Sequence, residues 1–266
     1  MTRRISTITG CLLAALALPL WTYAAAAGCH AGALGTARVL AVDPAATPAV
    51  GRKHFPATLP LAPREVVLTF DDGPWPGPTE RVLAALRDEC VRASFFMLGR
   101  NATAHAGLAR RVLAEGHTVG HHSHSHPLLN RMPVERAIAE VERGFASVET
   151  ALYGAAGAEP RTPFFRFPGF ASSPVLLDIL ARRRIAVFGA DLWASDWNPM
   201  PPARQLEQVL GRLDAAGSGI VLFHDTQPQT AAMLPALLRE LKTRGYRVVH
   251  AVPAAAAGAV KHVRQR

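Results

Sequence analysis

The sequence predicts an α/β fold of about seven strand–helix units, arranged as a (β/α) barrel. From Glu65 onward, short apolar runs alternate with segments of helical periodicity. This alternation is typical of parallel strands joined by crossover helices. The 266 residues are enough for one large domain or two small ones, and no internal repeat or second domain is visible. About seven units favour a barrel, with an open sheet as the alternative.

Each predicted element rests on a local pattern. Short apolar runs mark the strands, and the spacing of Val82, Leu83 and Leu86 is that of one helical face. Gly116 is placed to end one helix and Pro133 to begin another. We expect strands at 66–70, 93–98, 117–120, 164–166, 185–189, 220–223 and 246–249, and helices at 80–89, 105–115, 133–153, 174–184, 202–216 and 231–244.

Residues 1–27 have the layout of a secretory signal peptide. Arg3 and Arg4 precede an apolar stretch over 11–20, and small residues follow at 24–28. We expect cleavage after Ala27, with an uncleaved N-terminal anchor as the alternative. The apolar stretch is too short for a stable membrane span, which needs about 20 residues. The protein is therefore expected to be exported to the periplasm or the extracellular space.

The remaining boundaries follow from composition. Residues 28–63 are rich in Ala, Gly, Pro and Thr without sustained periodicity, and they are predicted to be a flexible tether. Residues 64–252 form the predicted catalytic domain, because all the chemical motifs lie within them. Residues 253–266 form a basic C-terminal tail.

Cys29 and Cys90 would both remain after cleavage, and their pairing stays open. A disulfide is compatible with an oxidising compartment. Because Cys29 lies in the predicted tether, we favour Cys90 as a buried free cysteine. Lipid attachment at Cys29 is a further alternative, but Ala26 stands where such sites usually carry a larger aliphatic residue.

The formal net charge of +9 raises the question of an acidic polymer as partner. All but three of the 29 basic residues are arginine, and they are scattered, with no run longer than 182–184. We therefore expect a solvated positive surface rather than binding to nucleic acid. We also expect a monomer.

Residues with catalytic chemistry gather at or just past the ends of the predicted strands. In parallel α/β folds the carboxyl ends of the strands lie at one edge and carry the functional residues. The coincidence predicts an active site there. Its members are Asp71, His122, Arg166, Asp191 and His224.

Asp71 and Asp72 directly follow the strand at 66–70. Adjacent residues leaving a strand point in different directions, so one carboxylate can bind a metal while the other takes a proton from water. The alternative is a turn, because Asp-Asp-Gly-Pro is favourable turn chemistry. A turn, however, needs no second carboxylate.

His122 and His126 have the spacing of a metal site. Histidines four residues apart lie on one side of helix-like backbone and suit tetrahedral zinc. Two histidines and one carboxylate leave a position open for water, whose pKa the metal lowers to about 7. A His-rich surface tract is the alternative. His121 and His124 are not excluded by spacing, because His117 and His121 are also four apart.

His224 and Arg166 add the remaining acid–base chemistry. A lone histidine at a strand end is usually a core residue; its functional role here would be a general acid that protonates the departing group. A neighbouring carboxylate, Asp191 or Asp225, would keep His224 charged. Arg166 would pair with a carboxylate and hold its pKa low, with a surface arginine as the alternative.

Taken together, these segments resemble the polysaccharide deacetylases, the metal-dependent carbohydrate esterases that share the NodB-homology domain. Thr-Phe-Asp-Asp-Gly-Pro at 69–74 and His-Ser-x-x-His at 122–126 match closely, and their combination in this order is specific. The resemblance covers roughly 64–252. It implies a distorted (β/α) barrel with fewer than eight regular units.

The resemblance implies a role for each matched residue. Asp71 is the implied catalytic base, oriented by Arg166, and His224 is the implied catalytic acid. Leu222 would line the pocket for the acetyl methyl group. The implied ligands of a divalent metal, usually zinc with an ion such as cobalt as the alternative, are Asp72, His122 and His126.

Two departures from the family pattern concern the substrate groove. Relatives carry an aromatic residue directly after the proline of the arginine motif, whereas here Gly169 precedes Phe170. The Gly169 N–H can still bind the oxyanion, but the aromatic wall is in question. The Asp-x-x-Asp-Trp motif is longer by two residues. We assign Asp191 to tune the acid histidine and Trp197 to the groove, with Asp196 as the alternative to Asp191.

The expected activity is hydrolysis of N-acetyl groups on a polysaccharide such as peptidoglycan, a chitin-like chain or an exopolysaccharide. The expected partner is therefore an acetylated glycan. Alternatives are an O-acetyl esterase acting on xylan-type glycans, a hydrolase of small cyclic amides, and a catalytically inactive glycan-binding homologue. A metal-storage role would leave Asp71, Arg166 and His224 unexplained.

Overall fold

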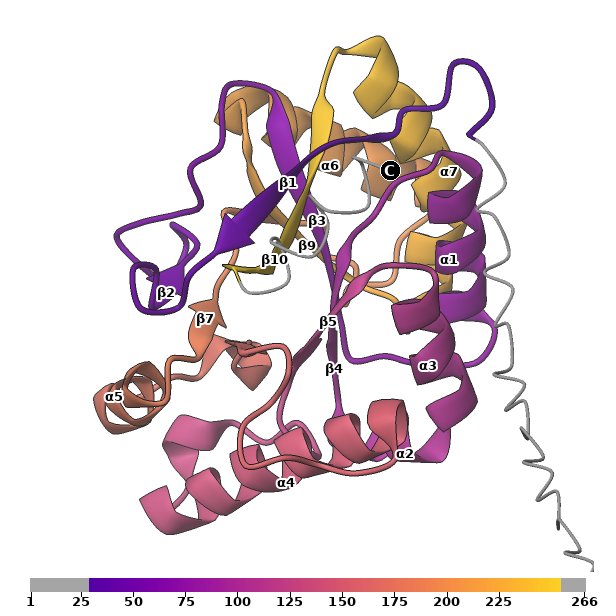
Figure 1. Cartoon of the computed structure of the whole chain (residues 1–266). Coiled ribbons are helices and arrows are strands. Elements are labelled where there is room, and N and C mark those ends of the chain that lie inside the picture. The colour runs from indigo at the N-terminus through magenta and orange to yellow at the C-terminus, as the bar shows by residue number, and fades with distance from the viewer. Residues whose placement is uncertain (1–28, 255–266) are drawn as a thin grey trace, which may run out of the picture.

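The computed structural model describes residues 29–254. These residues form a ten-stranded sheet in which every strand pairing is parallel. Helices pack around this sheet (Figure 1). The predicted signal peptide at 1–27 and residues 255–266 of the predicted tail lie outside the described residues.

The strands follow the apolar runs of the sequence closely. β3 is the central strand, and all seven of its residues are buried. The ten strands are β1 (Thr36–Val42), β2 (Ala49–Val50), β3 (Glu65–Asp71), β4 (Ser94–Met97), β5 (Thr118–His121), β6 (Phe164–Phe165), β7 (Ala186–Phe188), β8 (Leu192–Trp193), β9 (Gly219–His224) and β10 (Arg247–Pro253).

The sheet curls into a distorted barrel. β3 pairs with β9 on one side and with β10 and β4 on the other. From β4 the order continues through β5, β6 and β7 to β2, while β1 lies outside β10 and β8 outside β9. The chain between β7 and β8 links the two ends, because Gly189 N–H donates to Val50 O and Asp191 N–H donates to Ile220 O. The prediction of a barrel rather than an open sheet is confirmed.

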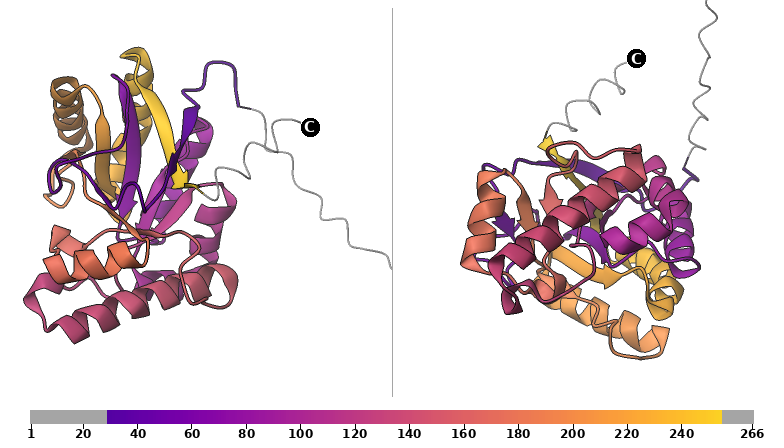
Figure 2. Two further views of the ribbon diagram at one scale, coloured as in Figure 1. Left: turned by 60° about the vertical axis from the view of Figure 1, so that its left-hand side comes forward. Right: turned by 90° about the horizontal axis from the view of Figure 1, so that it is seen from below.

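Helices lie around the strands when the molecule is seen from below (Figure 2). Proline opens α1, α5, α6 and α7, at a position where its missing N–H costs nothing. Within residues 29–254, no helix combines the length and apolarity needed to cross a membrane. The helices are α1 (Pro78–Asp88), α2 (Gly99–Ala104), α3 (Ala106–Ala114), α4 (Val134–Tyr153), α5 (Pro174–Arg182), α6 (Pro202–Ala216) and α7 (Pro228–Thr243), with short 3₁₀ turns η1 (Leu129–Arg131) and η2 (Pro168–Phe170).

Apolar helix faces pack against the strands and form the core. Val82, Leu83 and Leu86 of α1 are fully buried, as their spacing predicted. Burial of one such side chain contributes roughly 1.5–3 kcal/mol to folding. The core therefore holds the carboxyl edge of the barrel as a rigid support for the residues that follow each strand.

The flexible tether predicted for 28–63 is wrong for its described part. β1 pairs with β10 over six of its residues, and β2 pairs with β7. Arg38 of β1 also forms an ion pair of 2.6 Å with Glu65, at the start of β3. The folded domain therefore begins before residue 64. The sequence did not predict these strands, because the segment is rich in small residues and proline. Its strands form only by pairing with β10 and β7, which lie far along the chain.

Cys29 and Cys90 form a disulfide, with Cα atoms 5.9 Å apart. The expectation that Cys90 is a free buried cysteine is therefore wrong. The bond ties the N-terminal segment to the turn after α1. A sulfur engaged in a disulfide cannot also carry a thioether-linked lipid, so this pairing argues against lipid attachment at Cys29.

Candidate active site

The strands around β3 end level with one another, and this register assembles the site. Asp71 at the end of β3 is paired with His224 of β9 on one side and with Phe96 of β4 on the other. His121 at the end of β5 is paired with Phe165 of β6. The residues that follow these positions therefore meet at the carboxyl edge of the barrel, as predicted.

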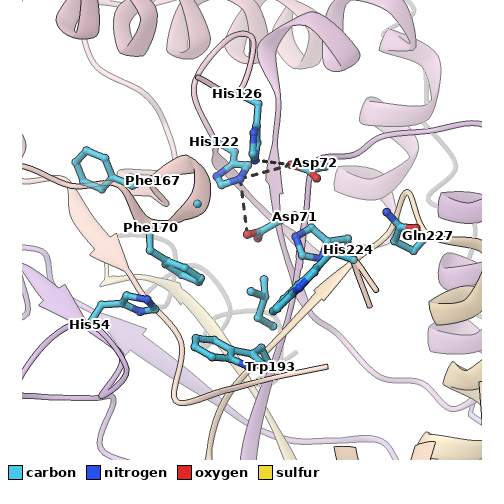
Figure 3. Close-up of a pocket in the computed structure, with 13 residues that line it drawn as sticks. His54, Asp71, Asp72, His122, His126, Phe167, Phe170, Trp193, His224 and Gln227 are labelled. Carbon is cyan, nitrogen blue, oxygen red and sulfur yellow. Dashed lines mark ion pairs between the residues drawn. The ribbon is translucent and has the colours of Figure 1, made fainter. Parts of the chain in front are cut away.

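Asp72, His122 and His126 converge on one point (Figure 3). Asp72 Oδ1 lies 3.5 Å from Nε2 of His122 and 3.5 Å from Nε2 of His126. Their three potential ligand atoms all lie within 4.8 Å of one another. The structure thus brings together the three residues that the sequence predicts as metal ligands.

This set of donors fits a divalent metal. Asp72 Oδ1 is buried without a hydrogen-bond partner, which is costly for a carboxylate oxygen unless a cation compensates it. Nδ1 of His122 lies 2.8 Å from the carbonyl oxygen of Arg166, so Nδ1 must carry the proton and donate it. Nε2 then presents a lone pair toward Asp72. One carboxylate and two imidazoles with an open position suit zinc.

Electrostatics favour the ligand form of His122. Burial lowers the pKa of His122 to about 3, although the charge of Asp72 opposes this. The imidazole is therefore neutral at ordinary pH, which is the state that binds a metal.

The loop that carries the two histidines is not helical, contrary to the expectation from their spacing. Ser123 and His126 both have positive φ, of 64° and 69°. Ser123 Oγ accepts a hydrogen bond of 3.1 Å from His126 N–H, which closes the loop. Gly144 of α4 lies against it, and a Cβ there would come within 2.5 Å of the Ser123 backbone. A tight loop, rather than a helix turn, sets the ligand positions.

The neighbouring histidines lie elsewhere. His121 is buried with Nε2 at 3.7 Å from Glu149, on the inner side of α4. His124 Nδ1 lies 3.1 Å from Ser147 Oγ. The described metal-binding group contains neither residue.

Asp71 is held by Arg166, as predicted. Nη1 of Arg166 donates to Asp71 Oδ1 at 2.6 Å and to Thr69 Oγ1 at 2.9 Å. Its other nitrogens donate to the carbonyls of Phe188 and Gly189. Burial raises the pKa of Asp71 above its ordinary value although the Arg166 charge opposes the rise, so the expectation of a low pKa is wrong. A surface position for Arg166 is excluded, since its side chain is fully buried.

Asp196, and not Asp191, is the partner of His224. His224 Nδ1 lies 2.8 Å from Asp196 Oδ1, and Asp196 is fully buried. Burial would lower the pKa of His224, but the hydrogen bond and charge of Asp196, together with Asp71 and Asp72, raise it to about 9. His224 is therefore protonated at neutral pH.

The assignment of Asp191 to the active site is wrong. Its carboxylate accepts hydrogen bonds from Arg52 N–H at 2.8 Å, Thr58 Oγ1 at 2.6 Å and Ile220 N–H at 2.7 Å. Ile220 lies at the start of β9, a strand's length from His224. The Asp-x-x-Asp-Trp motif is two residues longer here, and the chain between its two aspartates includes β8, which runs beside β9. Only the second aspartate, Asp196, therefore reaches His224.

A cavity of about 480 Å³ lies over these groups. Gly169, Trp197 and Leu222 line it, as the sequence predicts for substrate-binding residues. Phe170 also lines it, because Gly169 and Phe170 both take positive φ and turn the ring inward. An aromatic residue therefore does line the cavity at this place, although Phe170 stands one residue further from Pro168 than the aromatic residue of the family pattern. Lining residues that the sequence reasoning missed are His54, Phe167, Trp193 and Gln227.

A second buried carboxylate supports the Asp-Asp-Gly-Pro turn. Asp225 accepts from Gly73 N–H at 3.1 Å and from Thr79 Oγ1 at 2.6 Å. Burial raises the pKa of Asp225 to about 7, partly against the effect of Thr79. Asp225 is therefore tied to the turn after β3 and is not the partner of His224.

A buried carboxylate, a charged histidine and an Asp-His-His set around one cavity are the arrangement of hydrolytic enzymes. Residues 59–187 match the family model described as polysaccharide deacetylase. A chitin deacetylase of Colletotrichum lindemuthianum is 32% identical over 234 residues, covering 82% of this chain and 91% of that protein. The chain belongs to the polysaccharide deacetylase family.

Two further relatives are named as peptidoglycan deacetylases. The peptidoglycan-N-acetylglucosamine deacetylase PgdA of Listeria monocytogenes serotype 1/2a (strain 10403S) is 31% identical over 207 residues, which are 75% of this chain and 42% of that protein. The chain thus spans less than half the length of that relative. The structure of a peptidoglycan deacetylase from Bdellovibrio bacteriovorus superposes with a TM-score of 0.72 at 33% identity, covering 82% of this chain and 59% of that one.

Proposed function

We propose that the protein is an exported, zinc-dependent deacetylase that hydrolyses N-acetyl groups of a polysaccharide and releases acetate. One observation carries the proposal. A buried carboxylate (Asp71), a charged histidine (His224) and an Asp72–His122–His126 ligand set face the same cavity. Bound at those ligands, zinc would supply Lewis acidity toward the acetyl oxygen and the attacking water.

Asp71 acts as the general base. Arg166 occupies its Oδ1 at 2.6 Å, while Oδ2 lies on the His122 side at 3.8 Å from Nε2. The arginine therefore fixes the orientation of the carboxylate and leaves one oxygen for the water proton. The raised pKa of Asp71 makes the carboxylate a stronger proton acceptor.

His224 acts as the general acid. Its raised pKa of about 9 keeps the imidazole protonated at neutral pH, and Asp196 holds the ring through Nδ1. The Nε2 proton is then free for the leaving group. An amine needs this protonation more than an alcohol does, so the arrangement favours N-acetyl over O-acetyl substrates.

The remaining lining residues bind the acetylated sugar. The Gly169 N–H would donate to the developing oxyanion, Leu222 would contact the acetyl methyl group, and Trp197 would pack against the sugar. All three line the cavity. One chain supplies every group named, so the proposed site is complete within a single subunit.

The disulfide supports export, because such bonds persist in oxidising compartments. The relatives from Listeria and Bdellovibrio carry names that refer to peptidoglycan. We therefore infer that the substrate is a glycan of a cell wall or of another extracellular polymer.

Acetate release from a panel of substrates tests the proposal. The panel contains N-acetylglucosamine oligomers, peptidoglycan and acetylated xylan, each assayed with zinc, with a chelator, and after zinc is restored. We expect release from the N-acetylated glycans that the chelator abolishes and zinc restores. Release from xylan alone would establish the esterase alternative. Release from no substrate by a zinc-loaded protein that still binds the oligomers would establish an inactive glycan-binding homologue.

A further inference from the structure

Residues 51–58, which we name the 51–58 loop, follow β2 and reach the edge of the active-site cavity. The loop lies outside the part of the chain that matches the family model, which begins at residue 59. β2 attaches its start to β7, with Val50 paired to Phe188. His54 of this loop lines the active-site cavity. A segment predicted as a tether therefore contributes to the site.

Several contacts hold the 51–58 loop in place. Asp191 accepts hydrogen bonds from Arg52 N–H at 2.8 Å and from Thr58 Oγ1 at 2.6 Å. The same carboxylate accepts from Ile220 N–H at 2.7 Å, so it joins both ends of the loop to β9. Lys53 N–H also donates to Ala190 O at 3.0 Å. Asp191 therefore anchors the 51–58 loop to β9.

Gly51 allows the loop to approach the barrel. Its φ is 111°, a conformation that favours glycine. A Cβ at this position would lie 2.5 Å from Ala190 N and 2.9 Å from Gly189 Cα. Only glycine fits this close contact with the segment between β7 and β8.

His54 covers one face of Phe170. Their ring centroids lie 3.8 Å apart at an interplanar angle of 18°, which is a stacked pair. In Figure 3 His54 lies on the side of Phe170 away from the metal ligands. Phe170 has a positive φ of 56°, a strained conformation for an aromatic residue that its surroundings must maintain. The stacked imidazole is one such support.

Lys53 of the same loop lies over the ring of Trp193. Its Nζ lies 5.1 Å from the centroid of Trp193. Lys53 lines a separate cavity together with Arg212, whereas Trp193 lines both that cavity and the active-site cavity. The loop therefore backs two aromatic side chains, and each of them also lines the active-site cavity.

We propose that the 51–58 loop forms the rear of a saccharide subsite, in which Phe170 and Trp193 stack on the sugar next to the acetylated one. This inference rests on the proposed function. Aromatic faces bind the apolar faces of sugar rings, and a ring that is already fixed loses less conformational entropy on binding. Lys53, which lies over Trp193, and Asp191, which holds the loop, are positioning residues. His54 supports Phe170 and also lines the cavity itself.

Binding of N-acetylated glucosamine oligomers, from one to five sugars, tests the subsite by isothermal titration calorimetry. The measurements use the Asp71→Asn background, so that no substrate is consumed. We expect affinity to rise between one and three sugars, and His54→Ala to remove most of that gain. A loss of a stacked contact of this kind corresponds to roughly three- to tenfold in Kd.

Two further variants make the result specific. His54→Phe keeps an aromatic ring behind Phe170 and should bind the trimer within about twofold of the parent. Lys53→Ala removes the cation over Trp193 and should weaken trimer binding. Lys242→Ala, which removes a lysine on α7 outside the cavity, is its matched control and should leave the Kd unchanged. Turnover is measured in the protein that keeps the native Asp71. There, His54→Ala should raise KM for the trimer much more than it lowers kcat.

Some outcomes would overturn the inference. One is an equal Kd of the His54→Ala and parent proteins for every chain length, and another is a failure of His54→Phe to restore trimer binding in a folded protein. Failure of the proposed function has a different signature, because the wild-type enzyme would then release no acetate from oligomers that it nevertheless binds.

Discussion

Asp71 and Asp72 are adjacent in sequence but meet different partners. Asp71 is buried against Arg166, whereas Asp72, with a positive φ of 75°, turns toward His122 and His126. Neighbouring carboxylates can therefore take different tasks, because the backbone turns sharply between them.

Asp71→Asn should abolish turnover and keep the metal. Amide oxygen can still accept from Arg166, and the three ligands are untouched, but an amide cannot accept the water proton. We expect a fall in kcat of at least roughly 10²-fold, with zinc near one equivalent by elemental analysis.

His126→Ala is the matching variant for the ligand set. Removing one of three ligands should lower bound zinc and activity together. Full zinc content in His126→Ala, or loss of zinc in Asp71→Asn, would contradict the roles assigned to these residues.

We expect the His224–Asp196 pair to set the alkaline limit of activity. His224 has its pKa raised to about 9, so the acid form is present below that pH and is lost as the pH rises through it. Asp196→Asn removes the charge that raises this pKa. The alkaline limb of kcat should then move to lower pH, toward the ordinary imidazole value of about 6.5.

Asp191→Asn is the control for this experiment. Its carboxylate contacts Arg52, Thr58 and Ile220 rather than His224, so the alkaline limb should stay in place. If the alkaline limb of kcat moved in Asp191→Asn but not in Asp196→Asn, then Asp191 rather than Asp196 would be the partner of His224.

At the scale of elements, Arg166 joins three strands of the barrel. It follows β6 and donates to Thr69 and Asp71 of β3, to Phe188 of β7 and to Gly189 just beyond it. The guanidinium has five donors in a rigid fork, and here it satisfies several buried acceptors at once. Both the shape of the barrel edge and the position of the base therefore depend on this side chain.

Arg166→Met should destabilise the fold strongly. The change leaves the Asp71 carboxylate buried without its counter-ion, and removal of one partner of such a pair costs roughly 3–5 kcal/mol. Urea unfolding followed by circular dichroism measures the loss in the free energy of unfolding. Arg182→Met removes an exposed ion pair with Asp178 and should change that free energy by less than about 1 kcal/mol. Similar values for the two variants would show that Arg166 has no such role.

The elements that the sequence predicted well are those with a local signal. The helix expected at 202–216 matches α6, and the strand expected at 66–70 lies within β3. β1, β2, β8 and α2 were missed. The first three are stable only through partners distant in the chain, and α2 is too short to show a helical period.

At the scale of the whole molecule, the N-terminal segment wraps the barrel. The Cys29–Cys90 bond anchors its start, β1 extends the sheet beyond β10, and β2 extends it beyond β7. The segment then supplies the 51–58 loop. The same stretch of chain thus contributes to the stability of the fold and to the lining of the active-site cavity.

Cys90→Ser should lower the free energy of unfolding by roughly 2–4 kcal/mol, because the bond closes a loop with a sequence separation of 61 and so restricts the unfolded chain. Urea unfolding with and without a reductant measures this loss. The reductant should destabilise the wild type by a similar amount and leave the variant unchanged. An effect of the reductant on the variant, or none on the wild type, would contradict the disulfide.

Sequence alone predicted which side chains assemble at the site. Asp71, Asp72, His122, His126 and His224 stand in short contiguous motifs at strand ends, and parallel strands bring such ends to one edge whatever the rest of the chain does. The residue types and their order therefore sufficed to predict that these five side chains meet at one cavity.

Tertiary structure decided which distant side chains meet. Whether Asp191 or Asp196 reaches His224 depends on how far β8 carries the chain beside β9, and the backing of Phe170 by His54 depends on the pairing of β2 with β7. These contacts arise from long-range packing, to which no local pattern of residues corresponds.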